Sequence, residues 1–343
     1  MSSVRSFTDF GTLREIVVGS PAGFHVPDAD LSLRHFFGLP ADHVESRPAA
    51  GALERAVEET EEDLQALSET LVGLGVTVRR PDPFEQGRTV SLLDWATTAN
   101  HALMPRDCLL VVGERIIEAP MAVRARYAET FPFRRLVREY FDSGAIWVAA
   151  PRPQLPDSTY EFTENGPVLA ESEPLFDAAN LLRCGSDLFF NVSNTGNRLG
   201  AEWLRRLLGA EYTVHEISIC DDHIGTTLHI LRPGVLLANA GRLSPDTLPE
   251  QFRGWKVLWF DEPQDDGFAL TWPRASTWIG MNILAYDEET IIVPARQEGL
   301  ARMLEKEGFT AVPVPFRHGR TFGGGFHCCT LDVRRDGSLA SYL

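Results

Sequence analysis

The segment of this chain with the clearest chemical potential lies near the C-terminus and reads Gly323-Gly324-Gly325-Phe326-His327-Cys328-Cys329-Thr330. Consecutive glycines allow backbone conformations that other residues rarely adopt, and they let the chain pass close to a ligand. A thiol follows directly, and a cysteine is a strong nucleophile once it is deprotonated. The segment therefore predicts Cys328 as a nucleophile. The alternative, which is commoner for cysteine in general, is a buried structural residue beside a tight turn.

Three upstream residues could complete a nucleophilic site with Cys328. His223 could give a proton to a leaving nitrogen and later take one back. Asp177 could orient the imidazole and stabilise its charged form, while Asp107 could provide a fixed anion for a cationic substrate. Carboxylates around a thiol suit attack on a guanidinium or amidinium carbon. They suit an ordinary acyl substrate less well, because its oxyanion needs hydrogen-bond donors.

Each of these residues also has a structural interpretation that the sequence leaves open. Asp177 could cap a short helix over 178–182, Asp107 could be a turn aspartate, and His223 could be a structural histidine before an apolar strand. A zinc site could be drawn from Cys220, His223 and the C-terminal histidine and cysteines. Adjacent cysteines rarely both bind one ion, however, and the chain has no C-x-x-C pair, so we expect no metal. Serine hydrolase chemistry has no G-x-S-x-G motif to support it.

The elements that would position these residues recur in one order, a strand, a helix and a second strand. Apolar runs ending at glycine or proline predict the strands, and apolar residues at helical spacing predict the helices. Because one such unit has too little core to stand alone, the repeat predicts a single α/β domain over residues 1–343 with radial pseudo-symmetry. The five predicted units are 14–19, 52–74 and 76–81; 108–113, 133–141 and 145–149; 187–192, 201–208 and 212–217; 235–239, 248–252 and 255–260; 290–294, 298–307 and 310–314.

A radial arrangement would bring the candidate residues together. The loops at one end of the units converge on a central axis, and Asp107, Asp177, His223 and Cys328 all lie at junctions between elements. We therefore expect these four residues to meet at the axis. A doubly wound protein of two domains is the alternative architecture. It is disfavoured because no G-x-G-x-x-G motif follows a strand and no linker rich in Pro, Gly or Ser divides the chain.

The composition limits the partners and the compartment. Among 343 residues, 48 are acidic and 32 basic, which gives a formal net charge of −16. Nucleic acid and an anionic membrane surface are therefore unexpected partners, whereas a cationic substrate suits this field. No apolar run approaches the length of a membrane span, and residues 1–10 lack a secretory signal pattern. Five unevenly spaced cysteines favour a reducing cytoplasm.

Several segments match a known pattern in order along the chain. The most specific runs from Gly323 through Cys328 to Asp332-Val333-Arg334-Arg335. The others are 15–19, 76–83, Met104-Pro105-Arg106-Asp107, Ile116-Ile117-Glu118-Ala119-Pro120-Met121 and Phe176-Asp177-Ala178-Ala179. By these segments, nearly the whole chain resembles the amidinotransferases that take the amidino group from L-arginine. That family includes glycine amidinotransferase and the inosamine-phosphate amidinotransferases of aminoglycoside biosynthesis.

The resemblance implies a five-bladed α/β propeller with pseudo-fivefold symmetry, which agrees with the five predicted units. It also implies a two-step exchange. Cys328 attacks the guanidinium carbon of L-arginine, L-ornithine leaves, and an amine acceptor then takes the amidino group from the cysteine. His223 would serve both proton transfers, with Asp177 orienting it.

For the donor, the resemblance implies that Asp107 binds the guanidinium, while Arg242 and Ser276 hold the carboxylate and the amino group. No metal or organic cofactor is implied. The oligomeric state is left open, with a homodimer as one option.

Three features depart from the family's usual pattern. The histidine is usually followed by isoleucine and aspartate, but this chain has His223-Ile224-Gly225, so one carboxylate for the guanidinium is missing. Asp221 or Asp222 could compensate. Asn180 stands where some members have aspartate. The segment before His223 is shorter than in the glycine-using enzyme. This difference predicts an acceptor amine larger than glycine, such as an amino-cyclitol or an intermediate of natural-product (antibiotic) biosynthesis.

Two other functions remain open on the sequence. A guanidine hydrolase of the same fold, such as an arginine deiminase-like enzyme, would resolve the cysteine adduct with water and release citrulline and ammonia. A non-catalytic arginine-binding protein would keep the pocket without the reaction, and Gly225 is the feature that favours it. The tail from Gly323 to Arg335 favours transfer over hydrolysis.

Overall fold

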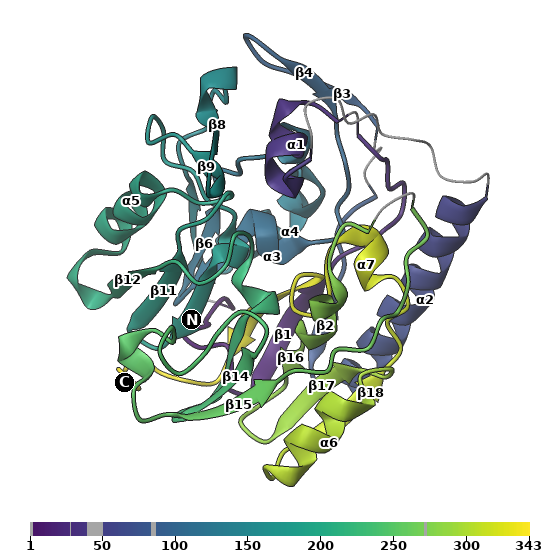
Figure 1. Cartoon of the computed structure of the whole chain (residues 1–343), viewed down its shortest axis with the longest axis vertical. Helices are drawn as coiled ribbons and strands as arrows, with labels where there is room; N and C mark the ends of the chain where they lie inside the picture. The colour runs from purple at the N-terminus through teal and green to yellow at the C-terminus, as the bar shows by residue number, and fades with distance from the viewer. Residues whose placement is uncertain (1–2, 28, 40–50, 84–86, 271–272) are drawn as a thin grey trace.

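The computed structural model describes residues 3–27, 29–39, 51–83, 87–270 and 273–343. Within these residues, five three-stranded sheets surround a central axis (Figure 1). The architecture is the five-bladed α/β propeller that the resemblance implied, and it agrees with the radial pseudo-symmetry that the repeated units predicted. In spatial order, the strands of the five blades are β19-β1-β2, β5-β6-β7, β10-β11-β12, β13-β14-β15 and β16-β17-β18.

Each blade contains one parallel strand pair, formed by the two strands that flank a helical connection. These pairs are β1 (Leu13–Val18) with β2 (Thr77–Arg79), β6 (Arg115–Glu118) with β7 (Ile146–Ala149), β11 (Asp187–Asn191) with β12 (Thr213–Ile217), β14 (Val235–Asn239) with β15 (Lys256–Phe260), and β17 (Thr290–Pro294) with β18 (Thr310–Val314). A third strand pairs antiparallel with the middle one. These third strands are β19 (Thr330–Arg335), β5 (Leu109–Val112), β10 (Leu181–Cys184), β13 (Leu228–Arg232) and β16 (Leu284–Ala285).

Helices connect the parallel strands on the outside of the ring (Figure 1). The longest is rich in alanine, leucine and glutamate, which favour helix, and its Leu64, Leu67 and Leu71 recur on one fully buried face. The connecting elements are α2 (Ala52–Gly73), α4 (Arg134–Asp142), α5 (Arg198–Leu208), α6 (Glu298–Lys306) and, in the fourth blade, the single 3₁₀ turn η7 (Glu250–Phe252).

Two details of the predicted units are wrong. The segment predicted as the first strand of the second unit, 108–113, is the antiparallel strand β5, and β6 is the strand that leads into the helix. The helix predicted at 248–252 is only the 3₁₀ turn η7. The antiparallel strands β10, β16 and β19 were not predicted, and β13 is the apolar strand expected after His223.

Those antiparallel strands left a signal in the sequence. Three of the blades contain hairpins that turn at Gly113, Gly185 and Gly234, whose φ angles are +59°, +74° and +80°. A glycine between two short apolar runs is the usual sign of such a turn. The hairpins were missed because these short runs were not recognised as antiparallel partners of the strands that follow them.

The ring closes through its first and last strands. In β1, Val17 faces Leu331 and Val18 faces Thr330 across the antiparallel pair with β19. This pairing places strands from near the two ends of the chain in one blade. At one end of the ring, Figure 1 shows further elements that the sequence did not predict: α1 (Leu31–Phe37), the hairpin of β3 (Thr89–Ser91) and β4 (Ala96–Thr98), and the hairpin of β8 (Tyr160–Thr163) and β9 (Gly166–Leu169).

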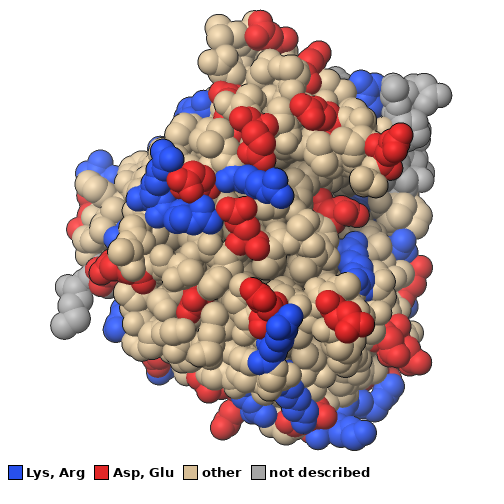
Figure 2. Space-filling view, turned by 60° about the vertical axis from the view of Figure 1, so that its left-hand side comes forward, with Lys and Arg blue, Asp and Glu red and all other residues tan. Residues whose placement is uncertain are grey.

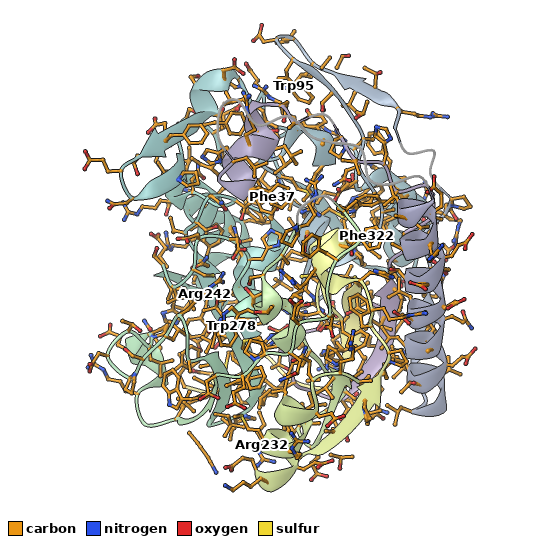
Figure 3. The ribbon with its side chains drawn as sticks, turned by 45° about the vertical axis from the view of Figure 1, so that its right-hand side comes forward. Phe37, Trp95, Arg232, Arg242, Trp278 and Phe322 are labelled. Atoms are coloured by element: carbon orange, nitrogen blue, oxygen red, sulfur yellow. The ribbon has the colours of Figure 1, made fainter. Side chains whose placement is uncertain are left out.

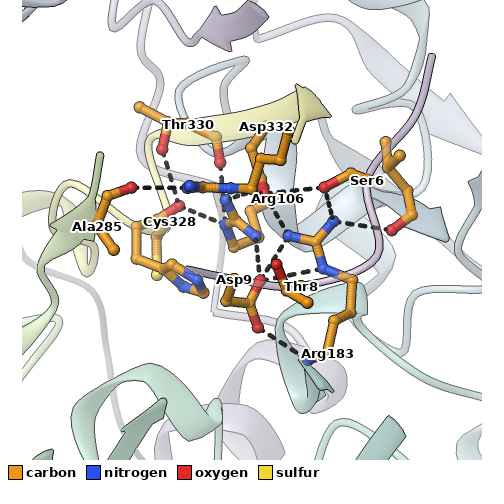
Figure 4. A network of polar contacts seen from close by, with 12 residues as sticks. Ser6, Thr8, Asp9, Arg106, Arg183, Ala285, Cys328, Thr330 and Asp332 are labelled. Carbon is orange, nitrogen blue, oxygen red and sulfur yellow. Dashed lines mark hydrogen bonds and ion pairs between the residues drawn. The ribbon is translucent and has the colours of Figure 1, made fainter. Parts of the chain in front are cut away.

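The centre of the ring holds a buried ion network (Figure 4). Asp332 of β19 accepts hydrogen bonds from Arg106 at 2.5 Å, from Arg335 at 2.6 Å, and from Arg183. Arg183 also donates to Asp9 at 2.5 Å. Burial by itself would raise the pKa of Asp332, but the three guanidinium groups hold it well below its usual value. The network joins residues from three blades and from the N-terminal segment.

The outer surface carries charges of both signs. On the face in Figure 2, acidic and basic side chains are interspersed over the surface. Within the part of the chain that the structure describes, no helix combines the length and the apolar character needed to cross a membrane.

Candidate active site

The predicted site residues lie on short turns of the chain that precede the third strands. Helix α3 (Pro105–Cys108) precedes β5, η4 (Ala178–Asn180) precedes β10, η6 (Ile224–Thr226) precedes β13, and η8 (Thr277–Met281) precedes β16. In this order, neighbouring short helices contact one another. Asp107 lies in α3, and Asp177 and His223 immediately precede η4 and η6. Cys328 lies in the turn before β19. The repeated architecture thus brings these four residues to one end of the axis.

The nucleophile turn depends on its glycines. A methyl group at Gly324 would overlap the side chain of Met104 and would lie 3.0 Å from the Cβ atom of Cys328. A methyl group at Gly325 would lie 2.7 Å from the Cβ atom of Asn282. Asn282 in turn accepts a hydrogen bond at its Oδ1 from the backbone N–H of Cys328, at 3.1 Å. The glycines therefore allow the close approach that holds the thiol in place.

The central ion network also holds the nucleophile turn. Arg106 donates from its Nε to the carbonyl oxygens of His327, at 2.8 Å, and Thr330, at 3.1 Å, on either side of Cys328. Figure 4 shows Cys328 beside this network. The same guanidinium that binds Asp332 thus fixes the backbone that carries the thiol.

The imidazole of His223 lies between two carboxylates and the thiol. Its Nε2 is 2.9 Å from Asp177 Oδ2, and its Nδ1 is 3.7 Å from Asp107 Oδ2. One ligand-type atom from each of Asp107, His223 and Cys328 lies within 4.8 Å of the others. Asp177 makes no capping hydrogen bond to η4, so the alternative of a capping aspartate is wrong. Its carboxylate instead lies at hydrogen-bond distance from the imidazole, and its orienting role stays a prediction.

The electrostatics of the site favour a protonated imidazole. Burial by itself would lower the pKa of His223, but three contacts outweigh it. These are the charge of Asp107, the hydrogen bond to Asp177 and a hydrogen bond to Cys328, and together they raise the pKa well above its usual value. A cationic His223 can donate a proton to a leaving nitrogen.

A buried arginine that the sequence reasoning missed completes the charge balance. Arg126 lies 3.0 Å from Asp107 Oδ2 and 3.5 Å from Asp177 Oδ2, and it forms a bidentate pair with Glu129 at distances of 2.7 to 3.0 Å. Burial raises the pKa of Glu129 to about 7, although Arg126 acts in the opposite direction. One sequence signal was available. An arginine and a glutamate three residues apart follow the matched segment 116–121.

The three clustered ligand-type atoms could also suit a metal ion. Arg126 already pairs with Asp107 Oδ2 at 3.0 Å, so this carboxylate oxygen is not left to an ion alone. Cys220, another residue of the zinc alternative, points its sulfur at the carbonyl oxygens of Asp222 and His223. The donor set therefore fits cysteine nucleophile chemistry better than metal binding.

A pocket opens onto this cluster. Among its lining residues are Asp107, Arg126 and His223, with Arg274 and Phe37 on its wall. The ring of Phe36, from α1, lies 5.8 Å from the imidazole of His223. The aromatic side chains of α1 therefore cover the histidine on one side, a contribution that the sequence did not reveal.

The comparisons with known proteins agree with this site. No protein-family model matches the chain. It is 45% identical to inosamine-phosphate amidinotransferase 1 of Streptomyces glaucescens, with 100% of this chain and 99% of the relative covered. It is 38% identical to the L-arginine:L-lysine amidinotransferase of Pseudomonas savastanoi pv. phaseolicola, covering 100% and 97%. The solved structure of an inosamine-phosphate amidinotransferase from Streptomyces griseus matches with a TM-score of 0.94 at 40% identity, covering 100% and 99%.

The chain belongs to the amidinotransferase family. The resemblance drawn from the sequence is therefore confirmed, and the protein is an amidinotransferase. The match to this solved structure and the five three-stranded sheets confirm the propeller, so the doubly wound architecture is wrong, and the single domain over residues 1–343 stays a prediction.

Arg242 and Ser276 are the two residues predicted to hold the donor. Arg242 contacts η6, and Ser276 immediately precedes η8. In the amidinotransferase, Arg242 donates to the hydroxyl oxygens of Thr226 and Thr227, each at 3.0 Å. Ser276 precedes η8 and is exposed. Trp278 of η8 lies against Gly241, where a methyl group would be 2.7 Å from its ring (Figure 3). The structure thus brings η8 next to Arg242, and the donor contacts of Arg242 and Ser276 remain predictions.

The departures from the family pattern have local explanations in the structure. A Cβ atom at Gly225 would lie 2.6 Å from Asn282 Nδ2, which donates to the carbonyl oxygen of Gly225 at 3.1 Å. An aspartate at this position would have to displace Asn282, the residue that holds Cys328. Asp222 lies 3.5 Å from Arg242, and the two side chains form an ion pair. Asn180 is buried and accepts from Thr195 at 3.1 Å.

Proposed function

We propose that this amidinotransferase moves the amidino group of L-arginine, through a covalent amidino-cysteine at Cys328, to an acceptor amine larger than glycine, and that it releases L-ornithine. The convergence of Cys328, His223 and Asp107 within 4.8 Å carries the proposal. The similarity to relatives named for inosamine phosphate supports an amino-cyclitol acceptor or a related intermediate of natural-product biosynthesis.

The first half-reaction forms the adduct. Asp107 holds the donor guanidinium as a counter-charge, and the electron pair of the Cys328 thiolate forms a bond to its central carbon. The C–N bond to the donor chain then breaks, and its electron pair stays on the nitrogen. His223 donates the proton that came from the thiol to this nitrogen. L-Ornithine leaves, and the cysteine carries a positively charged amidino group.

The second half-reaction reverses these steps with a different amine. His223, now neutral, removes a proton from the acceptor amine, whose lone pair attacks the amidino carbon. The C–S bond breaks, and the proton returns through His223 to the sulfur. No external oxidant, reductant or metal is needed for the atoms and charges to balance.

Arg126 supports both steps by neutralising the carboxylates around the histidine. Asp107, Asp177 and Glu129 converge on its guanidinium within 3.5 Å. Like charges this close repel one another, and a cation between them offsets that repulsion.

The hydrolase alternative predicts that water, instead of an amine, resolves the adduct. The distinguishing experiment supplies L-arginine with glycine and with larger amines, including amino-cyclitols and their phosphates, and identifies the products by mass spectrometry. We expect ornithine together with an amidino-acceptor, and faster transfer to the larger amines. Citrulline and ammonia would overturn the transferase proposal, and glycine as the fastest acceptor would overturn the acceptor class.

The proposed compartment is the reducing cytoplasm. Within the described residues, all five cysteines are free, and a thiol nucleophile stays reactive only while it is reduced.

A further inference from the structure

His229 is a buried histidine that takes no part in the reaction as described so far. It lies in β13, where its neighbours Leu228 and Ile230 pack into the apolar core of the blade. Because side chains alternate along a strand, His229 points to the opposite face. There its Nε2 atom lies 2.7 Å from the carbonyl oxygen of Gly225, four residues earlier in the chain.

This contact fixes the state of the His229 ring. A carbonyl oxygen can only accept a hydrogen bond, so Nε2 carries the proton and donates it. Burial lowers the pKa of His229 to about 4, and the contact with Gly225 opposes this shift only in part. The ring is therefore neutral near neutral pH. It serves as a fixed hydrogen-bond donor, not as a carrier of protons.

The carbonyl oxygen of Gly225 accepts a second hydrogen bond, and this one leads to the nucleophile. Asn282 donates to it from Nδ2 at 3.1 Å, while its Oδ1 accepts from the backbone N–H of Cys328, also at 3.1 Å. Gly225 lies two residues after His223. Through this one oxygen, His229 and Asn282 therefore hold the segment that carries the imidazole against the turn that carries the thiol.

A ring contact joins the same two segments. The ring of His327, the residue before Cys328, lies 5.3 Å from the ring of His229 at an interplanar angle of 86°. Both rings are buried. A methyl group at Gly225 would lie 2.6 Å from Asn282 Nδ2 and 3.4 Å from His327 Nδ1. A glycine at this position thus allows all three side chains to pack around its backbone.

We propose that His229 is a positioning residue of the transfer reaction. By donating to the carbonyl oxygen of Gly225, it keeps the imidazole of His223 and the thiol of Cys328 in their reactive arrangement. This inference rests on the proposed function, since it takes Cys328 as the nucleophile. His229 acts through Gly225 and Asn282, and it neither gives nor takes a proton in the reaction.

The test measures the first half-reaction, in which L-arginine without an acceptor forms the amidino-cysteine, by rapid quenching and intact mass. Two quantities are read: the final fraction of protein that carries the adduct, and the rate constant of its formation. A partly unfolded protein lowers the fraction, whereas a misplaced thiol or imidazole lowers the rate constant.

We expect His229→Leu to reach the full fraction with a rate constant about 10- to 100-fold lower, as for other small displacements of a reacting group. The L-arginine concentration that gives half the maximal rate should change by less than about 3-fold, because the substitution leaves the predicted donor contacts in place.

Two further variants separate the hydrogen bond from the stability of the fold. In His229→Gln, the amide can donate from near the position of the imidazole Nε2, so its rate constant should stay within about 3-fold of the unsubstituted value. His215→Leu is the matched control. His215 lies in β12 with its Nε2 2.8 Å from Asp187, and its ring stacks on Phe189. Its loss should lower stability in thermal unfolding and leave the rate constant unchanged.

The shared oxygen also predicts that His229 and Asn282 act together. Asn282→Ala should slow adduct formation, because it removes the contacts to Gly225 and to Cys328. Residues of one hydrogen-bond network have effects that do not simply add in free energy. We therefore expect the double variant with His229→Leu to be slowed by less than the product of the two single losses.

Each of these measurements can overturn the inference. An unchanged rate constant in His229→Leu, or a loss of the final fraction alone, would make His229 a structural residue only. A His229→Gln variant as slow as His229→Leu would show that the hydrogen bond is not what matters. Losses that multiply in the double variant would separate His229 from Asn282. Failure of the proposed function gives a different result, because the unsubstituted enzyme would then form no adduct on Cys328.

Discussion

At the scale of single residues, the site is a buried balance of charges around one thiol. Three carboxylates face two cations, His223 and Arg126, in a volume from which water is largely excluded. Each charge is tolerated there only because an opposite charge is within a few ångströms. Removing one member should therefore disturb the ionisation of the others as well as its own contacts.

Arg126→Met should lower kcat/KM for L-arginine about 100-fold or more, because it leaves Asp107 and Asp177 without their cation. Arg126→Lys should retain part of the activity, since it keeps the charge but loses the bidentate geometry. Steady-state kinetics with thermal unfolding as a check on folding measures both. Arg138→Met, which removes an exposed arginine paired with Asp142, is the control and should change neither quantity. Full activity in Arg126→Met would refute the assigned role.

Asp107→Asn should lower the pKa of His223, because the charge of Asp107 is one of the contacts that raise it. The imidazolium would then be lost at a lower pH than in the unsubstituted enzyme. An NMR titration of the His223 ring measures the shift directly and does not depend on substrate binding. An unchanged or higher pKa in the variant would show that Asp107 does not set the charge of the histidine.

At the scale of elements, one design recurs: a short turn or helix precedes the third strand of each blade and presents a polar side chain. The nucleophile turn is the most constrained of these, because it is fixed by Asn282 on one side and by Arg106 on the other. Glycine is the residue that fits between them. Gly324 and Gly325 are therefore required mainly because a larger side chain would clash with Met104 and Asn282, and less because of their backbone flexibility.

Gly324→Ala should lower kcat strongly, because the added methyl group meets Met104 and the Cβ atom of Cys328. We expect its effect on the free energy of unfolding to be smaller than its effect on activity. We expect a loss of about 10- to 100-fold, as for other small displacements of a reacting group. Gly299→Ala is the matched control. Gly299 lies in α6 with open space around it, so the change should keep activity and stabilise the helix by about 0.5–1 kcal/mol. Kinetics and urea unfolding of the two variants test the contrast, which equal activities would contradict.

The sequence predicted the elements best where the helical connection is long. The units around α2, α5 and α6 have amphipathic helices and were placed within a few residues. The fourth unit was less accurate because its connection is a 3₁₀ turn. The hairpin strands were missed because they are short and buried, and their apolar runs carry no period that separates them from loops.

The site residues were predictable to different degrees for a similar reason. Cys328 follows a distinctive glycine run, and Asp107, Asp177 and His223 lie at equivalent junctions, so type and position pointed to them together. Arg126 and Asn282 act through contacts with residues distant in sequence. Contacts of this kind arise only when the blades assemble.

At the scale of the whole molecule, the ring is closed by strand pairing and by the central ion network. Asp332 is the common acceptor for arginines from different blades. Because Arg106 also holds the nucleophile turn, ring closure and catalytic geometry depend on the same buried group.

Asp332→Asn should destabilise the fold at neutral pH by about 3–5 kcal/mol, because it leaves buried guanidinium groups without their counter-charge. The folded-state pKa of Asp332 is lowered, so its contribution is present above the unfolded-state pKa and is lost as pH falls through the folded-state value. The difference between the two proteins should therefore shrink at strongly acidic pH. Asp336→Asn, at an exposed pair with Arg14, should cost at most about 1 kcal/mol. Urea unfolding at several pH values measures this, and equal costs for the two variants would contradict the central role of Asp332.

The most direct test of the account is the intact mass of the protein after incubation with L-arginine and no acceptor. We predict that the mass increases by one amidino group, that peptide mapping places it on Cys328, and that addition of an acceptor amine removes it. Cys328→Ala should remain folded and gain no mass. A chain that releases ornithine without ever carrying the added group, or that carries it on another residue, would contradict the proposed covalent transfer.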